Sequence, residues 1–161
     1  MMDDLLPIAA GIAERLKARR ETVAVVESSS GGLVSAALLA VPGASAYFLG
    51  GAIVYTKRAR VALLGITAVQ MEGKRSSSEP YAALLAATVR ERHGTSWGIA
   101  ETGAAGPTGN SYGDAAGHTC LAIAGPIGRV MTLETGSADR EANMRAFGVA
   151  LLNLFEEALA G

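Results

Sequence analysis

The stretch Thr22-Val23-Ala24-Val25-Val26, followed by Glu27-Ser28-Ser29-Ser30-Gly31-Gly32, decides the class of fold. Its first residues are apolar and mostly β-branched, which predicts a short buried strand. The serines and glycines after them are typical of a turn that leads into a helix, and residues 33–39 are apolar enough to form that helix. A strand, a polar turn and a helix in this order indicate an α/β protein.

The rest of the chain continues this alternation. Further helices are expected over residues 5–16, 60–64 and 77–94 and from residue 139 onward, and further strands over residues 51–56, 96–100, 118–124 and 129–135. The turn Gly125-Pro126-Ile127-Gly128 predicts an antiparallel hairpin between the last two strands. We therefore expect a three-layer α/β/α sandwich with a mixed, mostly parallel sheet, and residues 1–161 forming one domain.

The composition excludes several functional classes. The formal net charge is −1, which argues against nucleic-acid binding. No uncharged apolar stretch is long enough to span a membrane, and the amino terminus lacks the pattern of a secretory signal, so a cytoplasmic location is expected. The lone cysteine, Cys120, lies in an apolar run and is expected to be a core residue.

Two Gly- and hydroxyl-rich loops are candidate sites, because ligands of open α/β sheets bind at the carboxyl ends of the strands. They are residues 27–32 and 102–109. The first precedes a helix, whose unpaired N–H groups would suit an anion. Neither loop matches the phosphate-binding motif G-x-x-x-x-G-K-[ST] or the dinucleotide-binding motif G-x-G-x-x-G. Glu27 and Glu101 could each orient a hydroxyl, hold a substrate amine or cap a helix.

Metal and histidine chemistry are not expected. The two histidines, His93 and His118, have no third ligand at a suitable spacing, so no metal site is predicted. The sequence also lacks the G-x-S-x-G elbow of a Ser-His-Asp hydrolase. A serine nucleophile activated without histidine stays open, because a nearby cation or a Lys/Tyr pair can lower the barrier to its deprotonation.

Several segments, taken in order, resemble one known family. They are Glu27-Ser28-Ser29-Ser30-Gly31-Gly32, Pro42-Gly43-Ala44-Ser45-Ala46-Tyr47-Phe48, Gly51-Ala52-Ile53-Val54-Tyr55 and Thr102-Gly103-Ala104-Ala105-Gly106-Pro107. They are similar to the E-S-C-T-G-G, G-S-S-x-x-F, G-x-x-x-Y-S-N-x-x-K and T-G-I-A-G-P motifs of the C-terminal domain of the competence/damage-inducible CinA family. Residues 139–145 resemble its D-R-x-x-V-R helix start. The resemblance covers nearly the whole chain.

The resemblance implies an amidohydrolase of pyridine-nucleotide recycling. Family members include nicotinamide-nucleotide amidases, which convert nicotinamide mononucleotide and water to nicotinate mononucleotide and ammonia. It also implies no metal or cofactor, a small-molecule nucleotide substrate and a homo-oligomer. Many members carry a molybdopterin-binding-like domain in front, and because this chain starts at its first helix, a stand-alone form is expected.

Candidate residues follow from the matched motifs. A serine would attack the amide carbon, loop N–H groups would stabilise the oxyanion, and a phosphate would bind at the glycine loops. The candidates for catalysis are Ser30, Ser45, Tyr55, Lys57 and Arg60. The candidates for substrate binding are Glu27, Ser28, Ser29, Gly31, Gly32, Thr102, Gly103, Gly106, Arg140 and Arg145.

One departure from the family pattern bears directly on catalysis. The family lysine of Y-S-N-x-x-K is Arg60 here, and the family asparagine is Lys57. Arginine stays protonated in proteins and cannot act as a general base. Either Lys57 has taken over that task, or Arg60 only binds anions, or the reaction is lost. The alternatives to the amidase are a non-catalytic or regulatory nucleotide-binding protein and an amidase for a different substrate.

Overall fold

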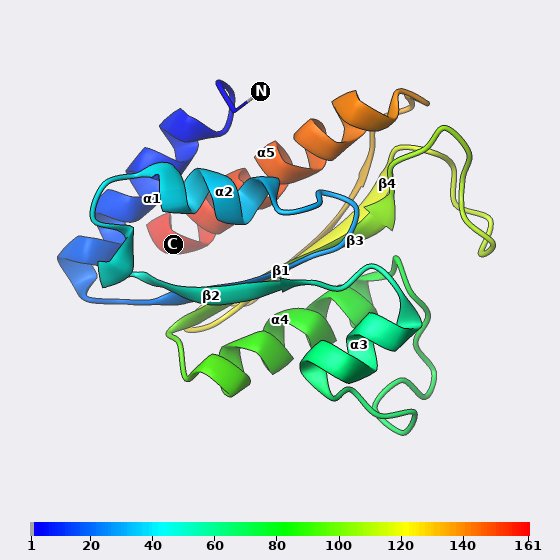
Figure 1. The fold of residues 1–161 in the computed structure, drawn as a ribbon, viewed down its shortest axis with the longest axis horizontal. Coiled ribbons are helices and arrows are strands. Elements are labelled where there is room, and N and C mark those ends of the chain that lie inside the picture. Colours follow the sequence, from blue (N-terminus) through cyan, green and yellow to red (C-terminus); the bar gives the residue numbers. More distant parts are fainter. Residues whose placement is uncertain (1) are drawn as a thin grey trace.

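A mixed five-stranded sheet forms the centre of the computed structural model, which describes residues 2–161 (Figure 1). The strand order is β2-β1-β3-β4-β5. β1 pairs in parallel with both β2 and β3, whereas β4 is antiparallel to both β3 and β5, so only β4 runs against the others. The strands are β1 Val23–Glu27, β2 Phe48–Ile53, β3 Trp97–Ala104, β4 His118–Ala124 and β5 Arg129–Glu134.

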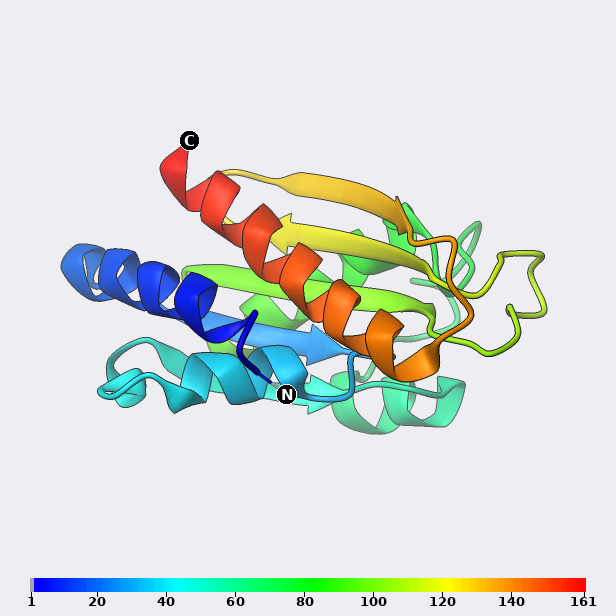
Figure 2. The same ribbon diagram turned by 90° about the horizontal axis from the view of Figure 1, so that it is seen from above.

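Helices cover both faces of the sheet, which confirms the predicted three-layer α/β/α sandwich (Figures 1 and 2). One face carries α1 (Leu6–Arg19), α2 (Leu33–Ala40) and α5 (Arg140–Ala160). The other carries α3 (Lys57–Leu64) and α4 (Glu79–His93). A short 3₁₀ helix, Ala44–Ala46, precedes β2.

The alternation of side chains along β1 divides the apolar residues into two cores. Val23 and Val25 point into the core under α1, α2 and α5, whereas Ala24 and Val26 point toward α4. Cys120 is buried in the second core, as expected. In the first core the Trp97 ring packs edge-on against Phe155, with 5.6 Å between ring centroids.

Three elements that lead to or follow the carboxyl ends of the parallel strands, β2, β3 and α3, have bounds that differ from the expected ones. β2 begins at Phe48 rather than Gly51, because Phe48 pairs with Val23 at the start of β1. β3 continues through residues 101–104, which were expected to be loop, because β4 pairs with its whole length. α3 begins at Lys57 rather than Arg60, because the Thr56 side chain caps it by accepting from the Ala59 N–H.

Because β1 is parallel to both β2 and β3, the carboxyl ends of these three strands lie side by side at the same end of the sheet. The loops that follow these strands therefore lie together at that end of the sheet. Among residues 2–161, no helix combines the length and the apolar character needed to cross a membrane. The cytoplasmic location stays a prediction.

Candidate functional site

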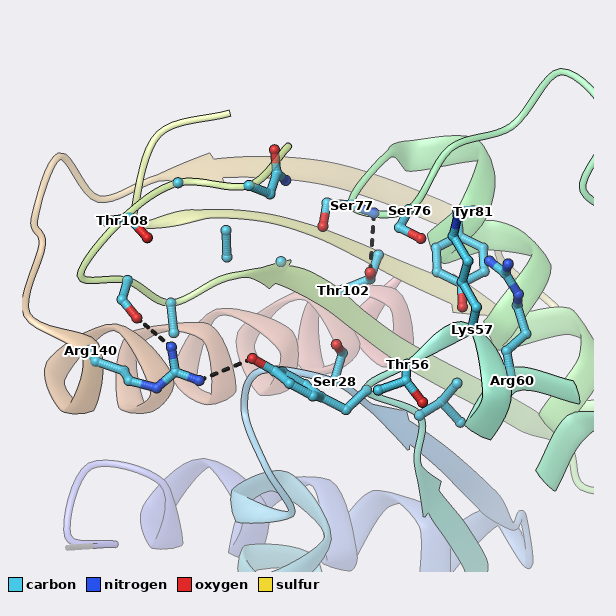
Figure 3. Close-up of a pocket in the computed structure, with 18 residues that line it drawn as sticks. Ser28, Thr56, Lys57, Arg60, Ser76, Ser77, Tyr81, Thr102, Thr108 and Arg140 are labelled. Atoms are coloured by element: carbon cyan, nitrogen blue, oxygen red, sulfur yellow. Dashed lines mark hydrogen bonds between the residues drawn. The ribbon is translucent and has the colours of Figure 1, made fainter. Parts of the chain in front are cut away.

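A pocket of about 350 Å³ opens at the carboxyl ends of these strands, between the loops after β1, β2 and β3 and the first turns of α3 and α5 (Figure 3). Many of the residues that sequence reasoning selected line it. These are Ser28, Tyr55, Lys57, Arg60, Thr102, Gly103, Gly106 and Arg140. The lining also includes polar residues that were not selected, namely Thr56, Ser76, Ser77, Thr108 and Asn110.

The charged residues in the pocket lining are all cations: Lys57, Arg60 and Arg140, with no aspartate or glutamate among them. Figure 3 shows Arg140 at one end of the pocket and Lys57 and Arg60 at the other. A concave site lined by charges of one sign concentrates ligands of the opposite sign. The pocket therefore favours an anionic ligand.

Arg140 holds two walls of the pocket together. Its guanidinium donates hydrogen bonds to the Gly106 carbonyl and, over 3.1 Å, to the Tyr55 hydroxyl. Gly106 itself has a φ of 114°, and a Cβ there would lie 2.9 Å from the Ala138 carbonyl oxygen. A glycine is therefore required at this position.

Ser28 is the serine of the first loop that reaches the pocket (Figure 3). Its backbone N–H donates to Glu101 Oε2 over 3.0 Å, which fixes the loop. Among the described residues Ser28 donates only this backbone hydrogen bond, none involves its hydroxyl, and the residue is 8% exposed. This hydroxyl is therefore free to meet a ligand.

Ser30, a predicted nucleophile, lies instead in a buried cluster beneath the pocket. Its hydroxyl lies 2.7 Å from Glu27 Oε1 and 2.8 Å from Glu101 Oε2. Glu101 also accepts from the hydroxyls of Ser29 and Thr119, over 2.7 Å and 3.0 Å. Ser30 and Ser29 therefore bind protein carboxylates and do not line the pocket.

Glu27 occupies the place expected for a bound phosphate. Its carboxylate accepts from the N–H groups of Gly32, Val34 and Ser35 at the start of α2, over 3.1, 3.0 and 2.9 Å. A carboxylate at a helix N-terminus is favoured by the helix dipole. Because the protein uses these N–H groups itself, the expectation that the first glycine loop binds a ligand phosphate is wrong.

Other predicted residues also lie outside the pocket. Ser45 is exposed in the 3₁₀ helix before β2, at the end of the sheet where the parallel strands begin, opposite the pocket. Arg145 pairs with Asp4 over 2.9 Å. Gly31 packs beneath Met144 of α5, and Gly32 faces Ile53.

Ser77 is a pocket residue that sequence reasoning missed. It has a φ of 56° although it is not glycine, and such backbone strain clusters at functional sites. Its N–H donates to the Thr102 hydroxyl over 3.2 Å, and its carbonyl accepts from His118 Nε2 over 2.8 Å. The run Ser77-Ser78-Glu79-Pro80 indicated only a helix start, and of its two serines Ser78 is the one that caps α4.

His118 anchors this segment from β4. Its Nδ1 contacts the Glu134 carboxylate and its Nε2 contacts the Ser77 carbonyl, so both ring nitrogens face acceptors. Burial lowers the pKa of His118, but these hydrogen bonds and the nearby Asp114 and Glu134 charges more than offset it and raise the pKa above its usual value. The charged imidazolium therefore fits this position.

Asp114 connects the same segment to the loop after β3. Arg75 holds it with two hydrogen bonds of 2.8 and 3.1 Å, and Asn110 donates a third over 2.8 Å. Burial raises the pKa of Asp114, but Arg75 and Asn110 outweigh it and lower the pKa. The sequence leaves open whether residues 110–116 are an ordered lid or a mobile loop, and in the structure hydrogen bonds tie residues 110–114 of this stretch together.

Sequence comparison places this architecture among known proteins. A family model described as the CinA C-terminal domain matches residues 6–159. A CinA-like protein of Anaeromyxobacter sp. (strain K) is 38% identical over 92% of the chain, and one of Gloeothece citriformis is 40% identical over 81%. The aligned regions are 36% and 31% of those relatives, so the chain spans about a third of their length.

Solved structures share the fold over nearly the whole chain. The competence/damage inducible protein CihA of Agrobacterium tumefaciens superposes with a TM-score of 0.87 at 27% identity, covering 98% of this chain and 96% of that one. A competence or damage-inducible protein of Enterobacter asburiae gives a TM-score of 0.88 at 26% identity, covering 94% and 96%.

Proposed function

Because this chain belongs to the CinA C-terminal domain family, we propose that its pocket hydrolyses the amide of a pyridine mononucleotide, as a nicotinamide-nucleotide amidase does. The observation that carries this proposal is the Ser28 hydroxyl, which has no hydrogen-bond partner among the described residues and lies in a pocket lined by cations alone among charged residues. The cations suit a phosphorylated substrate, and the hydroxyl suits attack on a carbonyl carbon.

We assign the nucleophile to Ser28 rather than Ser30 or Ser45. Ser28 lines the pocket, whereas the Ser30 hydroxyl is held by two carboxylates and Ser45 lies at the opposite end of the strands. Attack by the Ser28 oxygen on the amide carbon would form an acyl-enzyme and release ammonia. Water would then cleave that ester and release the carboxylate product and free Ser28.

Lys57 is our candidate for the group that takes the Ser28 proton. It lines the same pocket and, unlike Arg60 and Arg140, has a side chain that can lose a proton in proteins. Tyr55, oriented by Arg140, is our candidate for positioning the substrate. The homo-oligomer that the family resemblance implies remains part of the proposal.

The test is ammonia release from nicotinamide mononucleotide by the purified chain. We expect Ser28→Ala and Lys57→Met each to lower the rate at least 100-fold, the usual effect of losing a nucleophile or its base. Ser45→Ala, which changes a serine at the opposite end of the strands, is the matched control and should leave the rate unchanged. Equal rates in wild type and Ser28→Ala would contradict the assignment of the nucleophile.

A second candidate function is nucleotide binding without turnover. It is favoured by Arg60, which stands where the family motif has a lysine and which cannot accept a proton. Calorimetric binding of nicotinamide mononucleotide with no release of ammonia would support this candidate and reject the amidase.

A further inference from the structure

Arg60 is a buried cation that has no counter-ion within the described part of the chain. The residue is only 9% exposed, yet it lines the pocket and forms no ion pair with any carboxylate among residues 2–161. Arg75 and Arg140 differ, because the first is paired with Asp114 and the second donates to Gly106 and Tyr55. A guanidinium keeps its charge at all physiological pH values, and a buried charge without a partner is costly.

Tyr81 of α4 fixes the orientation of this guanidinium. The Arg60 guanidinium carbon lies 5.2 Å from the centre of the Tyr81 ring, a cation–π contact that covers part of the guanidinium group. The ring offers no negative charge that could neutralise the arginine. The remaining N–H groups are available to a ligand at the end of the pocket that Ser76 and Lys57 also line (Figure 3).

The chemistry of arginine restricts the group that could bind there. Its planar fork of N–H donors matches the paired oxygens of a carboxylate or phosphate and makes two parallel hydrogen bonds with them. A lysine at this position would offer a point charge without that geometry. The substitution of the family lysine therefore changes the kind of ligand group that this end of the pocket can hold.

We propose that Arg60, stacked on Tyr81, is an oxyanion-binding subsite that takes a carboxylate or phosphate group of the ligand at the end of the pocket opposite Arg140. That this ligand is a pyridine nucleotide rests on the proposed function. The mononucleotide carries a phosphate, and its hydrolysis product carries a carboxylate as well. Either group could fill the subsite, and a set of four compounds separates them.

The first experiment measures dissociation constants by calorimetry for nicotinamide riboside, nicotinate riboside and their two mononucleotides. The proteins are wild type, Arg60→Lys, Arg60→Gln and the control Arg58→Lys, which changes an exposed arginine of the same helix. We expect Arg60→Lys to weaken by about tenfold the compounds that carry the bound oxyanion, the size expected for loss of a charge-assisted hydrogen bond. Nicotinamide riboside and Arg58→Lys should show no change.

The pattern of loss identifies the oxyanion. Loss confined to the two mononucleotides assigns the phosphate, and loss confined to the two nicotinate compounds assigns the carboxylate. Equal weakening of all four compounds, or of none, would overturn the subsite. Far-UV circular dichroism shows whether the variants are folded, and the charge-conserving Arg60→Lys keeps the test valid should Arg60→Gln unfold.

A second experiment separates this proposal from the proposed function. Thermal unfolding is measured with increasing inorganic phosphate or acetate, each at constant ionic strength. If no pyridine compound binds but phosphate or acetate stabilises the wild type more than Arg60→Lys, the pyridine assignment fails and the subsite stands. If wild type and Arg60→Lys respond alike to every probe, the subsite is wrong whatever the substrate.

Discussion

Ser30 has one hydroxyl proton and two carboxylate neighbours, so it can donate to Glu27 or to Glu101 but not to both at once. Its N–H also donates to Glu101 Oε2 over 2.9 Å. These contacts join the end of β1 to β3 beneath the pocket. At the scale of the single residue, the serine is a structural bridge between buried carboxylates.

Replacing Ser30 by alanine should therefore affect stability directly. We expect Ser30→Ala to lower the free energy of unfolding by about 1–3 kcal/mol, the cost of leaving a buried polar partner unsatisfied. Urea denaturation followed by circular dichroism measures this. The exposed Ser45→Ala should change it by less than about 0.5 kcal/mol. Equal stability of the two variants would contradict the bridging role.

His118 should make stability depend on pH. Its pKa is raised in the folded chain, so its stabilising contribution is complete below about pH 6.5, the unfolded value, and is lost as pH rises through the folded pKa. The lowered pKa of Asp114 acts in the opposite sense: its stabilising contribution is present above the unfolded pKa of about 3.9 and is lost only at more acid pH. The two effects therefore separate.

The measurement compares wild type with His118→Gln by urea denaturation between about pH 5.5 and 9. The difference in unfolding free energy should be largest at the acid end and shrink as the pH rises. A difference that stays constant with pH would show that the charge on His118 contributes nothing to the anchoring of Ser77.

At the scale of the element, α2 depends on a side chain from the preceding strand. Glu27 accepts from three N–H groups at the start of this eight-residue helix, which has no side-chain cap of its own. Glu27→Gln should therefore lower the free energy of unfolding by about 2 kcal/mol or more, because charged hydrogen bonds are stronger than neutral ones. Urea denaturation gives this value.

The control for that variant is Glu14→Gln on α1, where the side chain is exposed. It should leave stability within about 0.5 kcal/mol of wild type. If Glu27→Gln were as stable as Glu14→Gln, the cap at the start of α2 would contribute little.

Sequence patterns predicted an element well when the residues of that element alone determine its conformation. The strand over residues 118–124 and the hairpin after it follow from an apolar run and a glycine-rich turn, and both are confirmed. Residues 101–104 resembled a loop because of their threonine and glycine. Their strand conformation depends on pairing with β4, a contact between distant segments that no local pattern contains.

The same distinction applies to the site. Tyr55, Lys57 and Arg140 were selected through their motifs and do line one pocket. Ser77 carries no such signal, because its conformation is imposed by Thr102 and His118, which are distant in sequence. Capping a helix was one of three roles open for Glu27, and the structure shows that it takes this role at the start of α2, a choice that sequence alone could not make.

At the scale of the whole molecule, the sheet separates two cores that should contribute independently to stability. Ile12 is fully buried on the α1 face and Ile66 on the α4 face. Each change to valine should cost about 0.5–1.5 kcal/mol, and the double variant should cost the sum to within about 0.5 kcal/mol. Unfolding in urea tests this. A marked departure from additivity would show that the sheet couples the two cores.

Trp97, the only tryptophan in the chain, begins the strand whose other end borders the pocket. Its indole N–H donates to Glu21 over 2.8 Å, and its ring is buried against Phe155. The eight residues of β3 place it about 23 Å from the opposite end of the strand, at about 3.3 Å per residue. The fluorescence of Trp97, excited selectively so that the pocket residues Tyr55 and Tyr81 do not contribute, should therefore report global unfolding and be insensitive to ligand binding in the pocket.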